Sequence, residues 1–102
     1  MTYKLFLDDE RHPVTNDWVV SRSSDEAIRI VQERGMPSEI AFDHDLGGDD
    51  TSMKFIWFFI DCYYDGELTI PDDFKYTVHS QNPIGVRNIK GLMDGFLNDI
   101  KE

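Results

Sequence analysis

The stretch LFLDDERHP, from Leu5 to Pro13, begins with an apolar run and passes directly into charged residues. A short apolar run that ends at loop residues is typical of a buried strand. The charged half places three carboxylates side by side, with an arginine and a histidine behind them. Two carboxylates about 4 Å apart repel by roughly 4 kcal/mol at an effective dielectric of about 20. We therefore expect a proton or a cation to offset the charge where this strand ends.

Composition limits the classes of protein that the chain can represent. Its 102 residues predict one domain, 1–102, and 40% hydrophobic with 13% aromatic residues is typical of a folded chain. A net charge of -10 argues against direct binding to duplex nucleic acid and favours a basic protein partner, if the partner is a macromolecule. The single cysteine, Cys62, fits a reducing compartment, and no apolar run approaches the length of a membrane span. We expect a cytoplasmic protein with no membrane contact.

Strand and helix patterns alternate along the chain. Apolar and β-branched runs predict strands at 3–7, 18–22, 39–42 and 74–80. Helical spacing of apolar residues predicts a helix over 25–35 capped by Ser24, and a second from Thr51 or Ser52 to about residue 64. A third begins at Pro83 with Asn82 as its N-cap. This alternation predicts an α/β fold, a three-layer sandwich with a mostly parallel four-stranded sheet covered on both faces.

Polar residues follow three of the predicted strands. Because ligand sites of parallel sheets form at the carboxyl ends of the strands, these residues are expected to meet at one edge. Oxygen ligands favour Mg²⁺ or Mn²⁺, which carboxylates hold together with water and substrate phosphate oxygens. The alternative is that the acids are caps and turn residues on a solvated rim. The candidate metal ligands are Asp8, Asp9, Asp43 and Asp45.

The same edge carries residues suited to a phosphate. Arg11 either holds a phosphate with its forked donors or neutralises the neighbouring carboxylates. The helix start at Asn82 presents free backbone N–H groups, and Ser80 either bonds a phosphate oxygen or starts a turn. His79 is a candidate general acid, with a polar core role as the alternative. Predicted catalytic residues are His79, Asp43 and Arg11, and predicted substrate-binding residues are Arg11, Ser80 and Asn82.

Four blocks of the sequence, LFLDDERHP, WVVSRSSDEA, FDHDLGG and VHSQNPIGVRNI, resemble a known family in their order and spacing. The chain is similar to receiver domains of response regulators, and more closely to their shortened branch, the cyclic-phosphate-processing receiver-like domains. The resemblance implies a compact flavodoxin-like fold. It also implies that Asp8 and Asp9 form the acidic pair, with Asp9 a direct metal ligand, and that Asp43 stands at the receiver phosphoacceptor position. Asp45 falls where receivers offer a backbone carbonyl to the metal.

The chain departs from the receiver pattern in three places. His79 stands where receivers have Thr or Ser, and no fifth strand with its lysine follows the last helix. Too few residues separate Asp8 from Trp18 for the first crossover helix. The second strand therefore runs either parallel through a wide loop or antiparallel, and the resemblance favours parallel. Because the chain lacks this lysine and hydroxyl, we do not expect it to act as a phosphorylation switch.

Three functions follow from these observations. The first is a divalent-metal-dependent phosphoric ester hydrolase acting on a small phosphorylated ligand, such as a cyclic phosphate on a nucleotide or RNA end, a reaction class that the resemblance implies. The second is a receiver-like regulatory or phosphate-binding module without turnover. The third is an acidic protein-interaction domain with a basic partner. Metal dependence separates the first two from the third.

Overall fold

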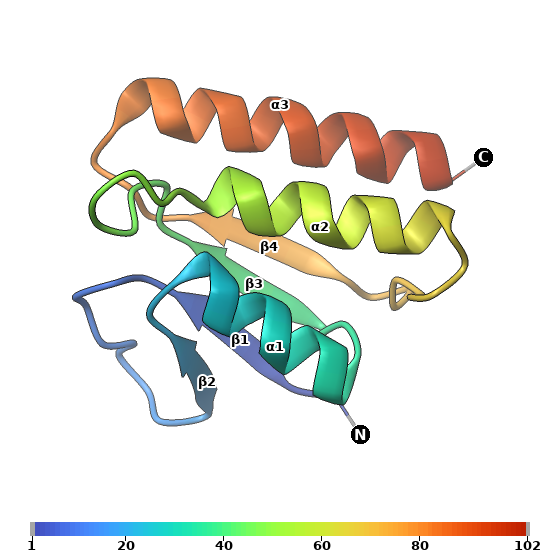
Figure 1. Ribbon diagram of the computed structural model, residues 1–102, viewed down its shortest axis with the longest axis horizontal. Coiled ribbons are helices and arrows are strands. Elements are labelled where there is room, and N and C mark those ends of the chain that lie inside the picture. The colour runs from blue at the N-terminus through green and yellow to red at the C-terminus, as the bar shows by residue number, and fades with distance from the viewer. Residues whose placement is uncertain (1, 102) are drawn as a thin grey trace.

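The protein, described here by a computed structural model for residues 2–101, has a parallel four-stranded sheet and three helices (Figure 1). The order along the chain is β1 Lys4–Leu7, β2 Trp18–Ser21, α1 Ser24–Arg34, β3 Glu39–Phe42, α2 Ser52–Tyr64, β4 Lys75–Val78 and α3 Pro83–Ile100. The strands are arranged β2-β1-β3-β4, and every neighbouring pair is parallel. The predicted α/β receiver-like architecture and the parallel direction of β2 are confirmed.

The hydrophobic core lies between the sheet and the helices. Alternate strand residues face it, including the fully buried Leu5, Ile40 and Phe42. Phe55 and Phe59 of α2 pack against this layer, with the ring of Phe55 centred 6.4 Å from that of Phe42. None of the described helices is both long and apolar enough to cross a membrane.

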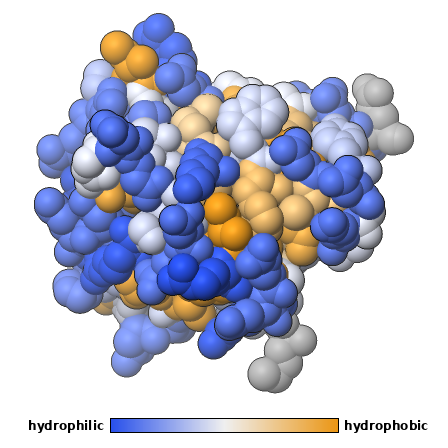
Figure 2. Space-filling view, viewed as in Figure 1, coloured by the Kyte–Doolittle hydropathy of each residue, from blue (hydrophilic) through white to orange (hydrophobic). Residues whose placement is uncertain are grey.

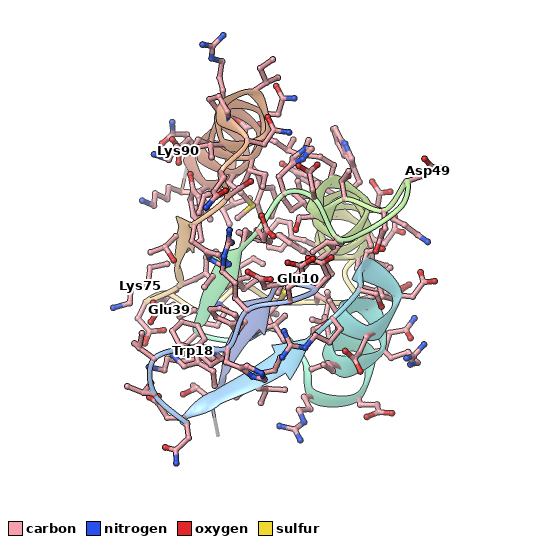
Figure 3. All side chains as sticks on the ribbon, turned by 90° about the vertical axis from the view of Figure 1, so that its left-hand side faces the viewer. Glu10, Trp18, Glu39, Asp49, Lys75 and Lys90 are labelled. Carbon is pink, nitrogen blue, oxygen red and sulfur yellow. The ribbon has the colours of Figure 1, made fainter. Side chains whose placement is uncertain are left out.

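All three helices lie on the same side of the sheet, so the predicted third layer is wrong for residues 2–101 (Figures 1 and 3). The chain crosses the sheet in one direction, from β2 to β3 through α1 and from β3 to β4 through α2. Right-handed crossovers therefore place α1 and α2 on the same face. Only the step from β1 to β2 runs the other way, and a loop makes that connection. A helix there would have formed the third layer.

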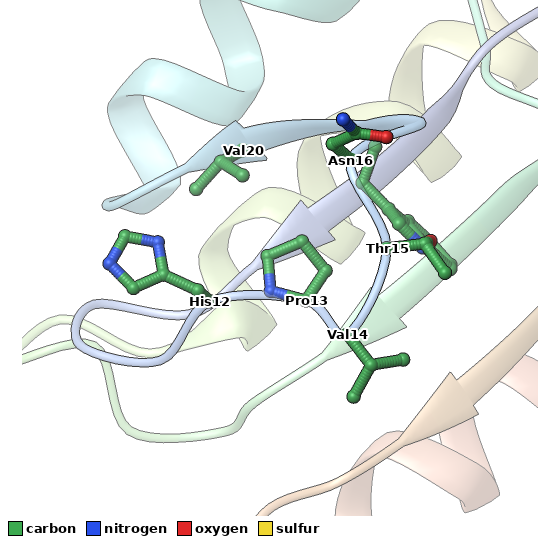
Figure 4. Close-up of a pocket in the computed structure, with 7 residues that line it drawn as sticks. His12, Pro13, Val14, Thr15, Asn16 and Val20 are labelled. Atoms are coloured by element: carbon green, nitrogen blue, oxygen red, sulfur yellow. The ribbon is translucent and has the colours of Figure 1, made fainter.

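The face without helices is covered by its own side chains and by the β1–β2 loop. Trp18, Glu39 and Lys75 lie on this side, which we call the open face (Figure 3). The ring of Phe6 lies between those of Trp18, at 6.0 Å, and His79, at 4.9 Å. The β1–β2 loop curls beside it and encloses a hollow lined by loop residues and by Val20 (Figure 4). Aromatic stacking and this loop thus substitute for a helix.

The helix starts agree with the sequence at one position and differ at another. Asn82 caps α3, and its side-chain oxygen accepts a hydrogen bond from the N–H of Gly85 at 3.0 Å, as predicted. In α1 the N-cap is Ser23 rather than Ser24, because the Ser23 hydroxyl accepts from the N–H of Glu26. Ser24 instead donates its hydroxyl and its N–H to the carboxylate of Asp50. That contact joins α1 to the acidic loop before α2.

Candidate active site

The sheet's hydrogen bonding continues beyond the strands and fixes the backbone of three candidate residues. The N–H of Asp8 donates to the carbonyl of Ser21 at 3.1 Å. The N–H of Asp43 donates to Leu7 at 2.8 Å, and that of His79 donates to Phe42 at 2.8 Å. These residues therefore hold strand-like positions at the carboxyl edge, where β1 and β3 separate and the connections leave in opposite directions.

Asp8 is the buried anchor of the site, with 1% of its surface exposed. One carboxylate oxygen accepts from the N–H groups of Glu10, at 2.8 Å, and Arg11, at 2.9 Å. The other accepts from Arg11 Nη1 at 3.2 Å and from His79 Nε2 at 2.9 Å. Burial acts to raise the pKa of Asp8, but the hydrogen bonds from Arg11, Glu10 and His79 hold that pKa below its ordinary value. Asp8 is thus ionised, and it orients both Arg11 and His79.

Three carboxylates converge at this edge. Oxygen atoms of Asp8, Asp9 and Asp43 all lie within 4.8 Å of one another. The Asp43 side chain is 12% exposed, and its closest cation is Arg11 Nη1 at 3.8 Å. Within residues 2–101, no group donates a hydrogen bond to the carboxylates of Asp9 or Asp43. These two groups offer negative charge and free oxygens close together, a donor set that suits a hard divalent cation such as Mg²⁺ or Mn²⁺.

A hollow of about 610 Å³ opens above the carboxylates. Residues from all three strand ends line it, namely Asp9, Glu10, Arg11, Asp43, Asp45, Gly47, Gly48, Ser80, Gln81 and Asn82. Gly47 and Gly48 have φ angles of 91° and 55°, so these glycines turn the acidic loop as their sequence suggests. A Cβ on Gly47 would lie 3.3 Å from a carboxylate oxygen of Asp9, and this glycine therefore keeps the loop close to the acids.

Asp45 lies on the rim of the hollow but outside the carboxylate trio. Its carboxylate accepts from His44 Nδ1 at 2.9 Å and from Asn82 Nδ2 at 3.2 Å. These hydrogen bonds hold the pKa of Asp45 below its ordinary value. The predicted role of Asp45 as a metal ligand gains no support from this arrangement, because its oxygens are committed to the loop and to the start of α3.

The predicted phosphate-binding residues lie at the hollow, but some of their polar atoms already form hydrogen bonds within the protein. Asn82 uses its oxygen to cap α3 and its nitrogen to hold Asp45. The Ser80 oxygen accepts from the N–H of Asn82 at 3.1 Å, which leaves its hydroxyl hydrogen free to donate. Arg11 is 42% exposed along its side chain and lines the hollow while bound to Asp8. Arg11 is therefore the cation best placed to meet an anion above the carboxylates.

His79 is not among the residues that line the hollow, and its side chain is 26% exposed. Its Nε2 atom bonds Asp8, and its ring stacks on Phe6 with an angle of 8° between the planes. Since a carboxylate only accepts, Nε2 carries the hydrogen. This geometry orients the His79 ring against Asp8, and the role of His79 as a general acid stays a prediction.

Arg22, which was not predicted as a site residue, holds the β1–β2 loop in place. Its Nη1 donates to the carbonyl of Asp8 at 3.0 Å and also to the carbonyl of Arg11. Its Nη2 donates to His12 Nδ1 at 3.2 Å. The available signal is a cation at the carboxyl end of a strand, and β2 ends at Ser21, one residue before the predicted end at Arg22.

Two other positions were also missed. The hydroxyl of Ser52 donates to the carbonyl of Asp43 and joins the start of α2 to the site. A Cβ on Gly85 would lie 2.4 Å from Cγ of His44, so α3 approaches the site closely only because residue 85 is glycine. Neither contact has a signature in the sequence, because each depends on the approach of a distant segment.

Comparison with known families agrees with this geometry. Residues 3–95 match the family described as the cyclic-phosphate processing receiver domain. Searches of curated proteins and of solved structures gave no significant match. The family match covers nearly the whole chain, including all the residues that line the hollow. The chain therefore belongs to the family of cyclic-phosphate processing receiver domains.

Proposed function

We propose that the protein is a divalent-metal-dependent phosphoesterase that hydrolyses a cyclic phosphate on a small nucleotide or an RNA end. The observation that carries the proposal is the pair of carboxylates, Asp9 and Asp43, which share a hollow with Arg11 and receive no hydrogen bond from residues 2–101. The family assignment supports the link to cyclic phosphates.

Each residue of the site has a separate role in this proposal. Asp9 and Asp43 would hold Mg²⁺ or Mn²⁺, with Asp8 behind them. The bound ion would polarise the phosphoryl oxygens and lower the pKa of a water molecule. Arg11 binds the charge of the phosphate while Asp8 fixes its guanidinium. His79 holds Asp8 in place from the open face.

A second candidate function is a phosphate-binding module without turnover. The contacts of His79 favour it, because the predicted general acid is bonded to Asp8 and does not line the hollow. In this case the metal and Arg11 would capture the phosphorylated ligand and release it unchanged.

Calorimetric titration of Mg²⁺ and Mn²⁺ into metal-free protein tests the proposal. We expect saturable binding by the wild type, loss of at least about 100-fold in affinity in Asp43→Asn, and little change in the matched loop variant Asp49→Asn. Hydrolysis of a 2′,3′-cyclic nucleotide is then assayed with each protein. Absence of metal binding by the wild type up to millimolar concentrations would contradict both candidate functions.

Turnover and binding together separate the two candidates. Metal-dependent hydrolysis supports the phosphoesterase, whereas metal-dependent binding of the nucleotide without hydrolysis supports the binding module. His79→Ala refines the assignment. A positioning role predicts that metal affinity and turnover fall together, and a general acid predicts that turnover falls alone.

A further inference from the structure

A third hollow lies along α1 and α2, and it shares no lining residue with the candidate active site. It measures about 370 Å³ and is lined by Val31, Gln32, Gly35, Phe58, Cys62, Glu67 and Leu68. Apolar residues gather on this helix-bearing face of the molecule and are surrounded by hydrophilic ones (Figure 2). We call this hollow the helix groove. Its size suits one apolar side chain rather than a whole helix.

Three exposed acids lie at the end of α2 beside the helix groove. Glu67 lines the groove, and its N–H donates to the carbonyl of Cys62 at 2.8 Å. Asp61 precedes Cys62 on α2, and Asp65 is the C-cap of that helix. Within residues 2–101 none of these acids forms an ion pair. Lys54, the basic residue of α2, lies in the first turn of that helix and is bound to Asp25 at 2.7 Å.

These acids also stand at the unfavourable end of a helix. The last turn of α2 contains no basic residue, and Asp65 is its C-cap. The carbonyl groups at a helix C-terminus carry partial negative charge, so acidic side chains there repel them. By contrast, α1 ends with a cation, Arg34, as the dipole favours. A positive charge at the end of α2 would therefore be favourable, and no residue in the last turn of the helix provides one.

We propose that the helix groove docks a segment of a partner protein that inserts one apolar side chain and flanks it with Lys or Arg. The apolar part of the lining, Val31, Phe58 and Leu68, would receive the anchor. The acids Asp61, Asp65 and Glu67 would receive the cations. Charge complementarity selects this occupant, since the rim is acidic and the whole chain carries a net charge of -10. This interaction is independent of the metal site.

Fluorescence anisotropy with a labelled peptide tests the proposal. The probe is a short peptide with one central leucine between lysines, and the reference probe carries serine in place of the leucine. The rim variant is Asp61→Asn with Asp65→Asn and Glu67→Gln. The matched control, Asp72→Asn with Asp73→Asn and Asp99→Asn, removes the same charge from other exposed positions. We expect the rim variant to lose about tenfold or more in affinity, the control to lose less than about twofold, and the serine probe to bind weakly.

Thermal unfolding provides a readout that separates docking from a structural role. Because the acids repel the end of α2, the rim variant without peptide is expected to be as stable as the wild type or slightly more stable. A rim variant that unfolds at lower temperature than the wild type would show instead that the acids support the fold, and would overturn the proposal.

Three further outcomes also overturn it. Equal weakening in the rim and control variants would show general charge attraction. Absence of saturable binding up to about 1 mM peptide would show that the groove does not select this chemistry. Self-association in sedimentation experiments that Leu68→Lys abolishes would identify a second copy of the chain as the occupant.

Discussion

The two faces of the sheet are stabilised by different interactions. The face under the helices presents Leu5, Leu7, Ile40 and Phe42, all fully buried. The open face instead carries cross-strand charges and aromatic contacts, with the ring of Trp18 beneath the ammonium group of Lys4 at 4.6 Å. Stability is therefore concentrated on one face, and polar groups are tolerated on the other because no helix seals them from water.

The candidate site is an extension of the open face. Asp8, Asp43 and His79 each follow a strand residue that points towards the helices, so alternation directs them to the opposite side. The stacking of His79 on Phe6 agrees with this direction. The difference between the faces thus explains how the chain can bury a core and still present the carboxylates of Asp9 and Asp43, which receive no hydrogen bond from residues 2–101.

The largest effect is expected from truncation on the helix-covered side. Phe55→Ala removes a fully buried ring that contacts Phe42 and Phe59, and should lower the free energy of unfolding by about 3–5 kcal/mol. Val20→Ala on the open face should cost less than about 1 kcal/mol because that side chain is only half-buried. Urea unfolding of the two variants measures the difference. Equal losses would contradict the contrast between the faces.

A second prediction divides the carboxylates within the site. Asp8→Asn places an amide nitrogen among the donors of Arg11 and His79, and should lower the free energy of unfolding by about 2 kcal/mol. Asp43→Asn removes a carboxylate that receives no hydrogen bond from the described residues, and should leave the stability of the metal-free protein unchanged or slightly raised. Thermal unfolding in the presence of a chelator compares the two. A destabilised Asp43→Asn variant would mean that its carboxylate supports the fold.

A third prediction concerns Arg22. Replacement by methionine removes the donors that hold the carbonyls of Asp8 and Arg11, while retaining most of the apolar stem. Metal affinity should fall about fivefold, since the loop that carries the carboxylates is loosened. Calorimetry with Mn²⁺ measures this loss, and the exposed Arg87→Met serves as the charge-matched control. Unchanged affinity in Arg22→Met would show that the sheet alone positions the acids.

Much of the fold could be predicted from the sequence because its signals are local. Apolar runs that end in acids identify β1 and β3, and the pair Asn82 and Pro83 identifies the start of α3. The edge rule then brought Asp9, Asp43 and Arg11 to one hollow. These inferences succeeded because strand direction alone determines which residues meet.

The remaining features depend on tertiary contacts. The number of layers follows from the order of strands in the sheet, which no local pattern reports. Ser23 rather than Ser24 caps α1 because Asp50, distant in the sequence, holds Ser24. Asp45 lies two residues after Asp43 in the same acidic stretch, and hydrogen bonds from His44 and from the distant Asn82 hold its carboxylate at the rim.

The smallest effect we predict is on acid stability. The pKa of Asp8 in the folded protein lies below its ordinary value, which is about 3.9 in an unfolded chain. Between these two values the unfolded state binds more protons, so Asp8 contributes stability that is complete above about pH 5 and is lost as the pH falls through the folded pKa.

Asp8→Asn lacks this contribution, and the gap in unfolding free energy between wild type and variant should narrow as the pH falls. Urea unfolding in chelator from about pH 6 to pH 3 measures the gap, with Asp49→Asn as the control expected to follow the wild type. If the difference in unfolding free energy stays constant with pH, the hydrogen bonds to Asp8 do not favour its ionised form. Asp8 would then not be distinguished from Asp43 as the carboxylate that anchors the site.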